Sequence, residues 1–369
     1  MTRNHNHNHN NHHHQQPNTP KTIVFLDRQT FPRDIVLARP SIAHEWIAYD
    51  ETAPELIVPR LQDADIAITN KVVLNADVLA QLPQLKLIVV SATGYNNVDI
   101  DYCKAHGIAV CNVTAYAKQT VAEHTIAMIL TLSRHLLAYH NDVLQQHWHQ
   151  SPIFCLHHHP MNDLCGKTIG LIGQGAIGLA VAELASAFKM HVQFLAPSEY
   201  RNSGNMNNTN DTGNTENTGN LHHKTSDSNN QAKTHPYACV SWETFLATSD
   251  IISLHCPLTK DTANLIDRKA YQQMHKKPMI INTARGGIAN EADTVQALAN
   301  QQISAIGFDT LTQEPMTTTH PFQPLLGQPN VMITPHNAWA SQDTMKALWS
   351  QVIRNIELFC QGQIDNRIV

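Results

Sequence analysis

The segment "KTIGLIGQGAIG" at residues 167–178 constrains the fold more than any other stretch of the chain. A short apolar run is followed at once by Gly173, Gly175 and Gly178, and the residues after them have helical apolar spacing. In such a strand–turn–helix the first glycine permits a tight turn, the second lets a pyrophosphate approach the backbone, and the third lets helix and strand pack closely. The sequence therefore predicts a dinucleotide-binding turn at a helix N-terminus.

Apolar runs of strand length alternate with helical segments along most of the chain. They include "KTIVFLD", "DIAITN", "LKLIVVSAT" and "IAVCNV" in a first series, and "HVQFLA", "DIISLHC", "MIINTA", "SAIGFD" and "VMITP" in a second. Continuous apolarity is typical of parallel strands covered on both faces. The pattern predicts an α/β protein with two doubly wound parallel sheets. Between the two series, residues 119–146 are predicted to form one helix that joins two domains, with Leu136 and Leu137 on its apolar side.

Two segments have a composition that does not support a packed core. Residues 1–20 are rich in His and Asn, and we interpret them as a disordered tail that binds metals opportunistically, the alternative being a dedicated metal-binding tract. Residues 202–235 are rich in Asn, Thr, Ser and Gly and contain few aliphatic side chains. They predict a flexible surface insertion that follows a strand.

The overall composition excludes several classes of protein. A length of 369 residues suggests about two domains, and a formal charge of -5 offers no basic patch for nucleic acid. No apolar run approaches the ~18 residues needed to span a membrane, and the N-terminus lacks the apolar segment of a secretory signal. The seven cysteines are scattered without a CxxC pair. This distribution indicates neither a disulfide framework nor a thiolate zinc site, and it favours the cytoplasm.

Histidines are also frequent in "HWH" and "CLHHHP", which contain His147, His149 and residues 157–159. Because consecutive side chains rarely converge on one ion, we interpret this stretch as a surface loop and predict no metal site. Glu123 and His124 are neighbours on the predicted long helix and should point apart. We expect them to orient domain contacts rather than to catalyse.

Three strand ends in the second series carry polar residues suited to reduction of a 2-oxo acid. Arg285 in "IINTARGG" can bind a carboxylate through two parallel hydrogen bonds. His336 in "TPHNAWAS" can donate a proton to a carbonyl oxygen, and Glu314 in "FDTLTQEP" can orient that imidazole and favour its protonated form. A lone histidine after a strand is more often structural. The order of these residues after a dinucleotide turn makes the catalytic interpretation the better one.

The acid expected about 20 residues after the dinucleotide turn, to bind the adenosine ribose, is absent at Ala196. Glu199 could take its place and would favour NAD, whereas Arg201 could bind a 2′-phosphate and would favour NADP. Both could also be loop residues that face solvent. We favour NAD and keep NADP as the alternative.

Seven motifs together resemble the D-isomer-specific 2-hydroxyacid dehydrogenase family over residues 21–369. They are "ATGYNNVD", "TVAEHTIAMIL", "GLIGQGAIG", "HCPLT", "NTARGG", "FDTLTQEP" and "TPHNAWAS", in the family's order. Within the family, "SPIFC" ahead of "LCGKTIGLIG" and the tryptophan Trp339 are most similar to the glycerate dehydrogenase (hydroxypyruvate reductase) branch.

The resemblance implies roles for individual residues. Arg285, Glu314 and His336 would be catalytic, and the backbone amides of Thr93 and Gly94 would bind the substrate carboxylate together with Arg285. Trp339 would lie near the site. The cofactor contacts would be Gly173, Gly175, Ala176, Ile177, Gly178, Glu199, Cys256, Thr283, Ala284 and Asp309.

The resemblance also implies the architecture. A flavodoxin-like substrate domain would be formed by residues 21–116 and 337–369, and a Rossmann domain for NAD(P) by residues 117–336, with the active site between them. The protein would be a homodimer whose interface includes the segment at 119–146.

We therefore predict an oxidoreductase that transfers hydride between NAD(P)H and C2 of hydroxypyruvate. Alternatives within the family are a glyoxylate reductase and a D-lactate-type dehydrogenase. A formate dehydrogenase is disfavoured because it pairs its histidine with glutamine, where this chain has Glu314. An NAD-sensing, corepressor-like binding protein and a metal-buffering role for the N-terminal tail are alternatives of other classes.

Overall fold

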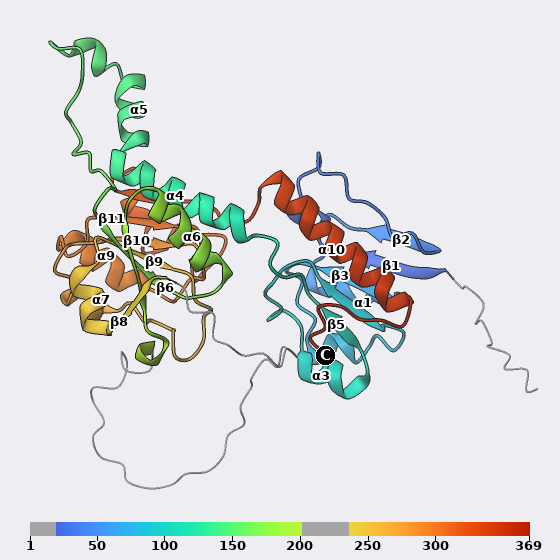
Figure 1. The fold of residues 1–369 in the computed structure, drawn as a ribbon. Helices are drawn as coiled ribbons and strands as arrows, with labels where there is room; N and C mark the ends of the chain where they lie inside the picture. Colours follow the sequence, from blue (N-terminus) through green and yellow to red (C-terminus); the bar gives the residue numbers. More distant parts are fainter. Residues whose placement is uncertain (1–19, 201–235) are drawn as a thin grey trace, which may run out of the picture. The chain divides into compact units, whose positions relative to one another are not determined.

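The computed structural model describes residues 20–200 and 236–369. The low-complexity tail up to residue 19 and the polar insertion at 202–235 lie outside the described residues. The chain divides into two compact units, of which unit 1 is formed by Met1–Tyr116 and Gln342–Val369 and unit 2 by Ala117–Ser341 (Figure 1). The return to unit 1 thus falls at Gln342, where the sequence-based prediction has residue 337.

Unit 1 contains a parallel sheet of five strands in the order β2-β1-β3-β4-β5. This is the strand order of flavodoxin-like doubly wound proteins, as the family resemblance implies. The strands are β1 (Lys21–Phe25), β2 (His44–Ala48), β3 (Ile66–Thr69), β4 (Leu87–Val90) and β5 (Ala109–Cys111). The helices are α1 (Ile57–Leu61), α2 (Ala76–Leu79), α3 (Ile100–His106) and α10 (Gln342–Cys360), with 3-10 turns η1 (Arg28–Thr30) and η2 (Pro54–Leu56).

The C-terminal segment completes the core of unit 1. Trp349 on α10 lies against Phe25 and Phe31, with ring centroids 5.3 and 5.5 Å apart. Beyond the helix, Ile368 N donates to Val110 O and Val110 N donates to Val369 O, so the last residues run beside β5. Residues from both ends of the sequence therefore build one core.

Unit 2 contains a parallel sheet of seven strands in the order β12-β11-β10-β9-β6-β7-β8. The strands are β6 (Thr168–Ile172), β7 (His191–Leu195), β8 (Ala238–Val240), β9 (Ile251–Leu254), β10 (Met279–Asn282), β11 (Ala305–Phe308) and β12 (Val331–Ile333). Chain order runs outward from β6 on one side and from β9 on the other. Ligands of open α/β sheets bind beyond the carboxyl ends of strands at such a switch point.

Helices cover both faces of the seven-stranded sheet. The helices of unit 2 are α4 (Lys118–Arg134), α5 (Leu136–Leu144), α6 (Ala176–Ala187), α7 (Trp242–Thr248), α8 (Arg268–Gln272) and α9 (Glu291–Ala299), with 3-10 turns η3 (Trp148–Gln150), η4 (Pro197–Tyr200) and η5 (Gln323–Leu325). Helices α4 and α6 lie side by side, and α5 extends away from the sheet (Figure 1). None of the helices in the described ranges is long and apolar enough to cross a membrane.

The prediction of one continuous helix at 119–146 was wrong. The helix breaks at His135, whose φ of 50° lies in the left-handed region. The His135 N–H donates to Leu132 O, and its ring Nδ1 lies 3.0 Å from Pro329 O. These two contacts fix the break, although no glycine or proline marks it in the sequence. Leu136 and Leu137, predicted on the apolar side, are consequently about half exposed.

Candidate active site

Three predicted site residues follow three neighbouring strands of unit 2. Arg285 follows β10, Asp309 follows β11 and His336 follows β12, and these strands are adjacent in the sheet. Because the strands are parallel, their carboxyl ends meet at one edge, and the three residues lie at that edge.

Glu314 and His336 form a direct pair. His336 Nδ1 lies 2.6 Å from Glu314 Oε2, and the side chains are 31% and 35% exposed. The other oxygen, Glu314 Oε1, accepts a hydrogen bond from Leu311 N at 2.9 Å. One oxygen of the carboxylate is thus held by the backbone of its own loop, while the other oxygen orients the imidazole. Both side chains retain access to solvent.

The turn that carries His336 is held by Asp309, which is only 2% exposed. Its Oδ1 accepts hydrogen bonds from Thr334 Oγ1 at 2.6 Å and Asn337 N at 3.0 Å, and its Oδ2 accepts one from Ala338 N at 3.0 Å. The Asp309 carbonyl accepts one from His336 N. These bonds hold His336 at φ 52°, in the left-handed region. Asp309 therefore positions the histidine, and its predicted cofactor contact stays a prediction.

His124 on α4 reaches the same turn. Its Nε2 lies 3.2 Å from Thr334 Oγ1 and 3.8 Å from Asp309 Oδ1. Its neighbour Glu123 accepts a hydrogen bond from Gln119 on its own helix. The two side chains therefore take different partners, as their helical spacing requires. The sequence interpretation did not foresee that His124 supports the segment that carries His336.

Arg285 is exposed and stands on a turn fixed by the buried Asn282. Asn282 Nδ2 donates to Arg285 O at 2.8 Å, and Asn282 Oδ1 accepts from Ala284 N at 3.0 Å. The guanidinium donates to Ala284 O and forms no ion pair in the described part of the chain. It is therefore available to an anionic ligand. Asn282 is a second supporting residue that sequence reasoning missed.

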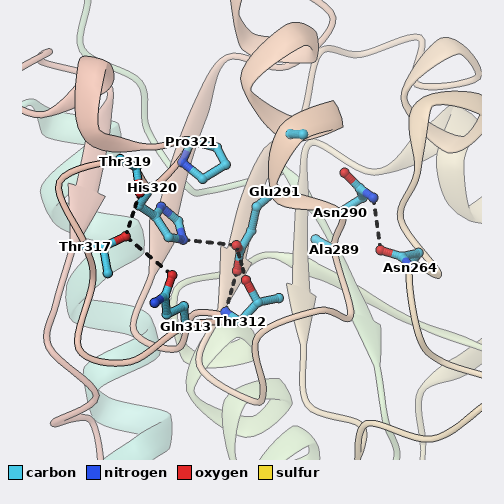
Figure 2. Close-up of a pocket in the computed structure, with 11 residues that line it drawn as sticks. Asn264, Ala289, Asn290, Glu291, Thr312, Gln313, Thr317, Thr319, His320 and Pro321 are labelled. Carbon is cyan, nitrogen blue, oxygen red and sulfur yellow. Dashed lines mark hydrogen bonds and ion pairs between the residues drawn. The ribbon is translucent and has the colours of Figure 1, made fainter.

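A buried carboxylate holds the loop that carries Glu314. Figure 2 shows Glu291 between Thr312 and His320 at the wall of a pocket. Its Oε1 accepts from Thr312 N at 2.7 Å, and its Oε2 accepts from Thr312 Oγ1 at 2.5 Å and His320 Nε2 at 3.0 Å. Phe322 N donates to His320 Nδ1, which leaves the hydrogen on Nε2. Glu291, the first residue of α9, therefore forms hydrogen bonds with residues near both ends of the 311–322 segment.

The glycine turn after β6 has the shape that a pyrophosphate requires. Gly173 has φ 113°, and a Cβ there would lie 2.5 Å from the His255 carbonyl carbon. A Cβ on Gly178 would lie 2.0 Å from Gly173 O, whereas one on Gly175 would meet nothing within 4 Å. Gly175 is the N-cap of α6, and no side chain caps the helix. The turn is therefore tight at Gly173 and Gly178 and open at Gly175, which fits a dinucleotide phosphate.

The other predicted cofactor contacts lie near this turn or at strand ends beside it. Ala176 and Ile177 form the first turn of α6, and Glu199 lies in η4 after β7. Cys256 follows β9, and burial raises the pKa of its thiol to about 11. Thr283 Oγ1 lies 2.9 Å from Thr125 Oγ1, and Ala284 follows it. Arg201 lies outside the described residues.

His255 is a half-buried residue at the switch point that the sequence analysis did not single out. Its Nε2 lies 2.9 Å from Ser253 Oγ, and its Nδ1 has no hydrogen-bond partner among the described residues. Burial lowers the pKa of His255 to about 3. The ring is therefore neutral at physiological pH.

Two further predicted residues lie in the loop after β4 in unit 1. Thr93 and Gly94 follow the strand end, and Thr93 O accepts a hydrogen bond from Asn112 Nδ2 at 2.8 Å.

In unit 2, the indole N–H of Trp339 donates to His336 O at 3.1 Å, so this tryptophan directly contacts the backbone of the candidate catalytic histidine.

Comparisons with known proteins find relatives over most of the chain. A family model described as "D-isomer specific 2-hydroxyacid dehydrogenase, NAD binding domain" matches residues 126–227 and 219–338. The chain is 38% identical to a glycerate dehydrogenase of Methylorubrum extorquens, with 94% of this chain and 98% of that protein covered. It is 33% identical to a hydroxypyruvate reductase of Blautia hydrogenotrophica, with 87% and 91% covered.

A solved structure has the same fold. The NADPH-dependent glyoxylate/hydroxypyruvate reductase of Sinorhizobium meliloti, in complex with NADP and malonate, superposes with a TM-score of 0.74. The identity is 22%, and the match covers 95% of this chain and 97% of that protein. At this identity the likeness supports the fold.

Proposed function

The chain belongs to the D-isomer specific 2-hydroxyacid dehydrogenase family, and from this premise we propose that it reduces hydroxypyruvate to glycerate with NADH. The observation that carries the proposal is the Glu314–His336 pair, with Arg285 at the same edge of the sheet. The identity to relatives named glycerate dehydrogenase and hydroxypyruvate reductase supports the choice of substrate.

In this mechanism the chain's own residues bind the substrate and deliver the proton. The Arg285 guanidinium binds the carboxylate and polarises the carbonyl, with the amides of Thr93 and Gly94 as further donors to the carboxylate. When bound, the nicotinamide supplies the hydride that C2 accepts. His336 Nε2 gives its proton to the carbonyl oxygen, so that the product is an alcohol. Glu314 holds Nδ1 of the same ring and favours the imidazolium before transfer.

The turn at Gly173–Gly178 and the uncapped first turn of α6 would hold the pyrophosphate of NAD(P). We assign a preference for NAD to Glu199, which lies after the strand next to β6, where an acid can accept hydrogen bonds from the adenosine ribose. A 2′-phosphate would be repelled by that carboxylate. Asp309, Cys256, Thr283 and Ala284 are the further cofactor contacts in this proposal.

We also propose that two copies associate through α5 and the segment that follows it. This part of unit 2 exposes a group of large apolar side chains: Leu136, Leu137, Val143, Leu144, Trp148, Ile153, Phe154 and Met161. An apolar group of this size on one projecting segment is typical of an interface.

We further propose a cytoplasmic location, which the seven unpaired cysteines support.

A steady-state screen tests the enzymatic proposal. Hydroxypyruvate, glyoxylate, pyruvate and phenylpyruvate are each offered with NADH and with NADPH. We expect the highest kcat/KM for hydroxypyruvate with NADH. A higher value for another acid would overturn the substrate assignment, and a higher value with NADPH would overturn the role of Glu199. Cofactor binding without turnover of any of the acids would favour a cofactor-sensing binding protein instead.

The association is tested by sedimentation velocity of Phe154→Asp. Phe154 is 89% exposed on the proposed interface, and Val36 is 87% exposed in unit 1. We expect Phe154→Asp to weaken the dimer and Val36→Asp to leave it intact. A monomeric wild-type protein at micromolar concentration would rule out the dimer.

A further inference from the structure

The segment that contains α5 and the following histidine-rich loop brings three imidazoles to one carboxylate. His147 Nδ1 lies 2.8 Å from Asp142 Oδ1, while His158 Nδ1 and His159 Nε2 each lie 3.2 Å from Asp142 Oδ2. The sequence interpretation held that neighbouring histidines such as these rarely converge. Here His158 and His159, although consecutive, reach the same oxygen.

The position of Asp142 within its helix is unusual. Of the nine residues of α5, all of them described, Asp142 alone is buried, whereas the leucines of the helix are exposed. A carboxylate buried in the last turn of a helix whose leucines are exposed needs compensating partners, and imidazoles from the following loop supply them. The surroundings of Asp142 are therefore polar.

We propose that Asp142, His147 and His158 bind a zinc ion. One ligand atom from each of the three residues lies within 4.8 Å of the other two. Zinc bonds of about 2.0–2.2 Å to nitrogen and oxygen place tetrahedral ligands about 3.4 Å apart, so modest side-chain adjustments complete the geometry. Imidazole and carboxylate ligands suit zinc, and a site of this type binds Zn²⁺ more tightly than Fe²⁺ or Mn²⁺. His159 or a water molecule takes the fourth position.

The ion would add a link between parts of the chain that are already connected by hydrogen bonds between Tyr139 Oη and the His159 backbone. Asp142 lies on α5, His147 just after it, and His158 beyond η3, so one ion would close the loop between them. Because the segment buries few apolar side chains, ligand bonds to a metal would account for a large share of its local stability. The expected consequence is a segment that is ordered with Zn²⁺ and exchanges its amide hydrogens faster without it.

The test must separate this site from the six histidines of the N-terminus, because a histidine-rich tract can bind divalent metals by itself. The full-length chain is therefore used with its six N-terminal histidines replaced by glutamine: His5, His7, His9, His12, His13 and His14. Zn²⁺ is titrated into this protein by calorimetry in competition with a chelator of known affinity. We expect one tight site per chain.

Asp142→Asn and His158→Gln are each expected to weaken that site at least tenfold, because each removes a ligand of the ion. His140→Gln and His149→Gln are matched controls, since both histidines are exposed and lie in the same segment outside the cluster. Equal Zn²⁺ affinity in the ligand variants and the controls would overturn the proposal.

Hydrogen exchange of the wild-type chain gives a second test that does not depend on the folding of a variant. Peptides that cover residues 142–160 should exchange more slowly with Zn²⁺ than with a chelator, while peptides of β9 and β10 should not change. Unchanged exchange over 142–160 at saturating Zn²⁺ would also overturn the proposal.

Discussion

His336 Nδ1 lies 2.6 Å from Glu314 Oε2, and this contact determines which ring nitrogen can act on a substrate. Because the Nδ1 hydrogen is donated to the carboxylate, Nε2 remains for the reacting oxygen. The carboxylate is in turn fixed by Leu311 N, so the imidazole is oriented before any substrate binds. Such an arrangement lowers the entropic cost of reaching the reactive geometry.

Replacing His336 by alanine should lower kcat with hydroxypyruvate at least ~100-fold, the range usual for loss of a general acid. Glu314→Gln should lower kcat less, because an amide can still orient the ring but no longer favours its charged form. Since the two side chains act as one unit, the double variant should be no slower than His336→Ala. Steady-state kinetics measures all three, with the exposed His140→Ala as control. Near-wild-type turnover by His336→Ala would contradict the mechanism.

Two glycines of the dinucleotide turn should respond differently to alanine. At Gly175 a Cβ meets nothing within 4 Å, so Gly175→Ala should fold normally but raise KM for NADH by obstructing the phosphate. At Gly178 a Cβ would lie 2.0 Å from Gly173 O, so Gly178→Ala should also lower the free energy of unfolding by about 1–3 kcal/mol. Thermal denaturation and NADH titration separate the two effects. Equal losses of stability would show that this account of Gly175 is mistaken.

Thr312→Val removes one hydrogen bond to the buried Glu291 carboxylate shown in Figure 2. We expect a loss of about 1–2 kcal/mol in the free energy of unfolding, as for hydrogen bonds to charged groups. Because the same segment carries Glu314, kcat should fall several-fold while KM for NADH stays unchanged. The control is Thr319→Val, whose exposed hydroxyl lies against Thr317. A normal kcat in Thr312→Val would mean that Glu291 does not help to position Glu314.

His255 should make the protein sensitive to acid. Burial lowers the pKa of the folded ring to about 3, while the ring of the unfolded chain titrates near 6.5. Between these pH values the His255 ring is protonated in the unfolded chain but not in the folded one. Its neutral form therefore contributes fully to the free energy of unfolding above pH 6.5, and this contribution falls as the pH decreases. The loss approaches about 1.4 kcal/mol per pH unit below pH 6. Denaturant unfolding at pH 7 and pH 5 should therefore show a smaller pH effect in His255→Gln than in wild type or His149→Gln; parallel pH profiles would refute this.

The sequence predicted the parts of the site that depend on strand order. Arg285, Asp309 and His336 each follow an apolar run, and parallel pairing brings those strand ends to one edge of a sheet. The tight glycines of the dinucleotide turn were predictable for the same local reason, since their spacing is imposed by the backbone. The two sheets and their doubly wound order followed from the alternation of strands and helices.

Contacts between segments far apart in sequence could not be predicted in this way. Asp309 reaches the turn at 334–338, Glu291 reaches His320, and His124 reaches Thr334, and no local pattern marks these pairs. The break at His135 depends on a carbonyl at Pro329, almost two hundred residues later. Helical spacing alone could not reveal it, because the periodic apolar pattern continues through the break.

The return of residues 342–369 to unit 1 determines which unit can be completed first during synthesis. All seven strands of unit 2 are synthesised before α10, so the sheet of unit 2 is complete in the chain while unit 1 still lacks its C-terminal helix. Unit 1 is made first but lacks Trp349 and the partners of Val110 until the last residues emerge. Unit 1 is therefore synthesised first and completed last. The apolar side chains that pack against α10 stay uncovered until that helix is made.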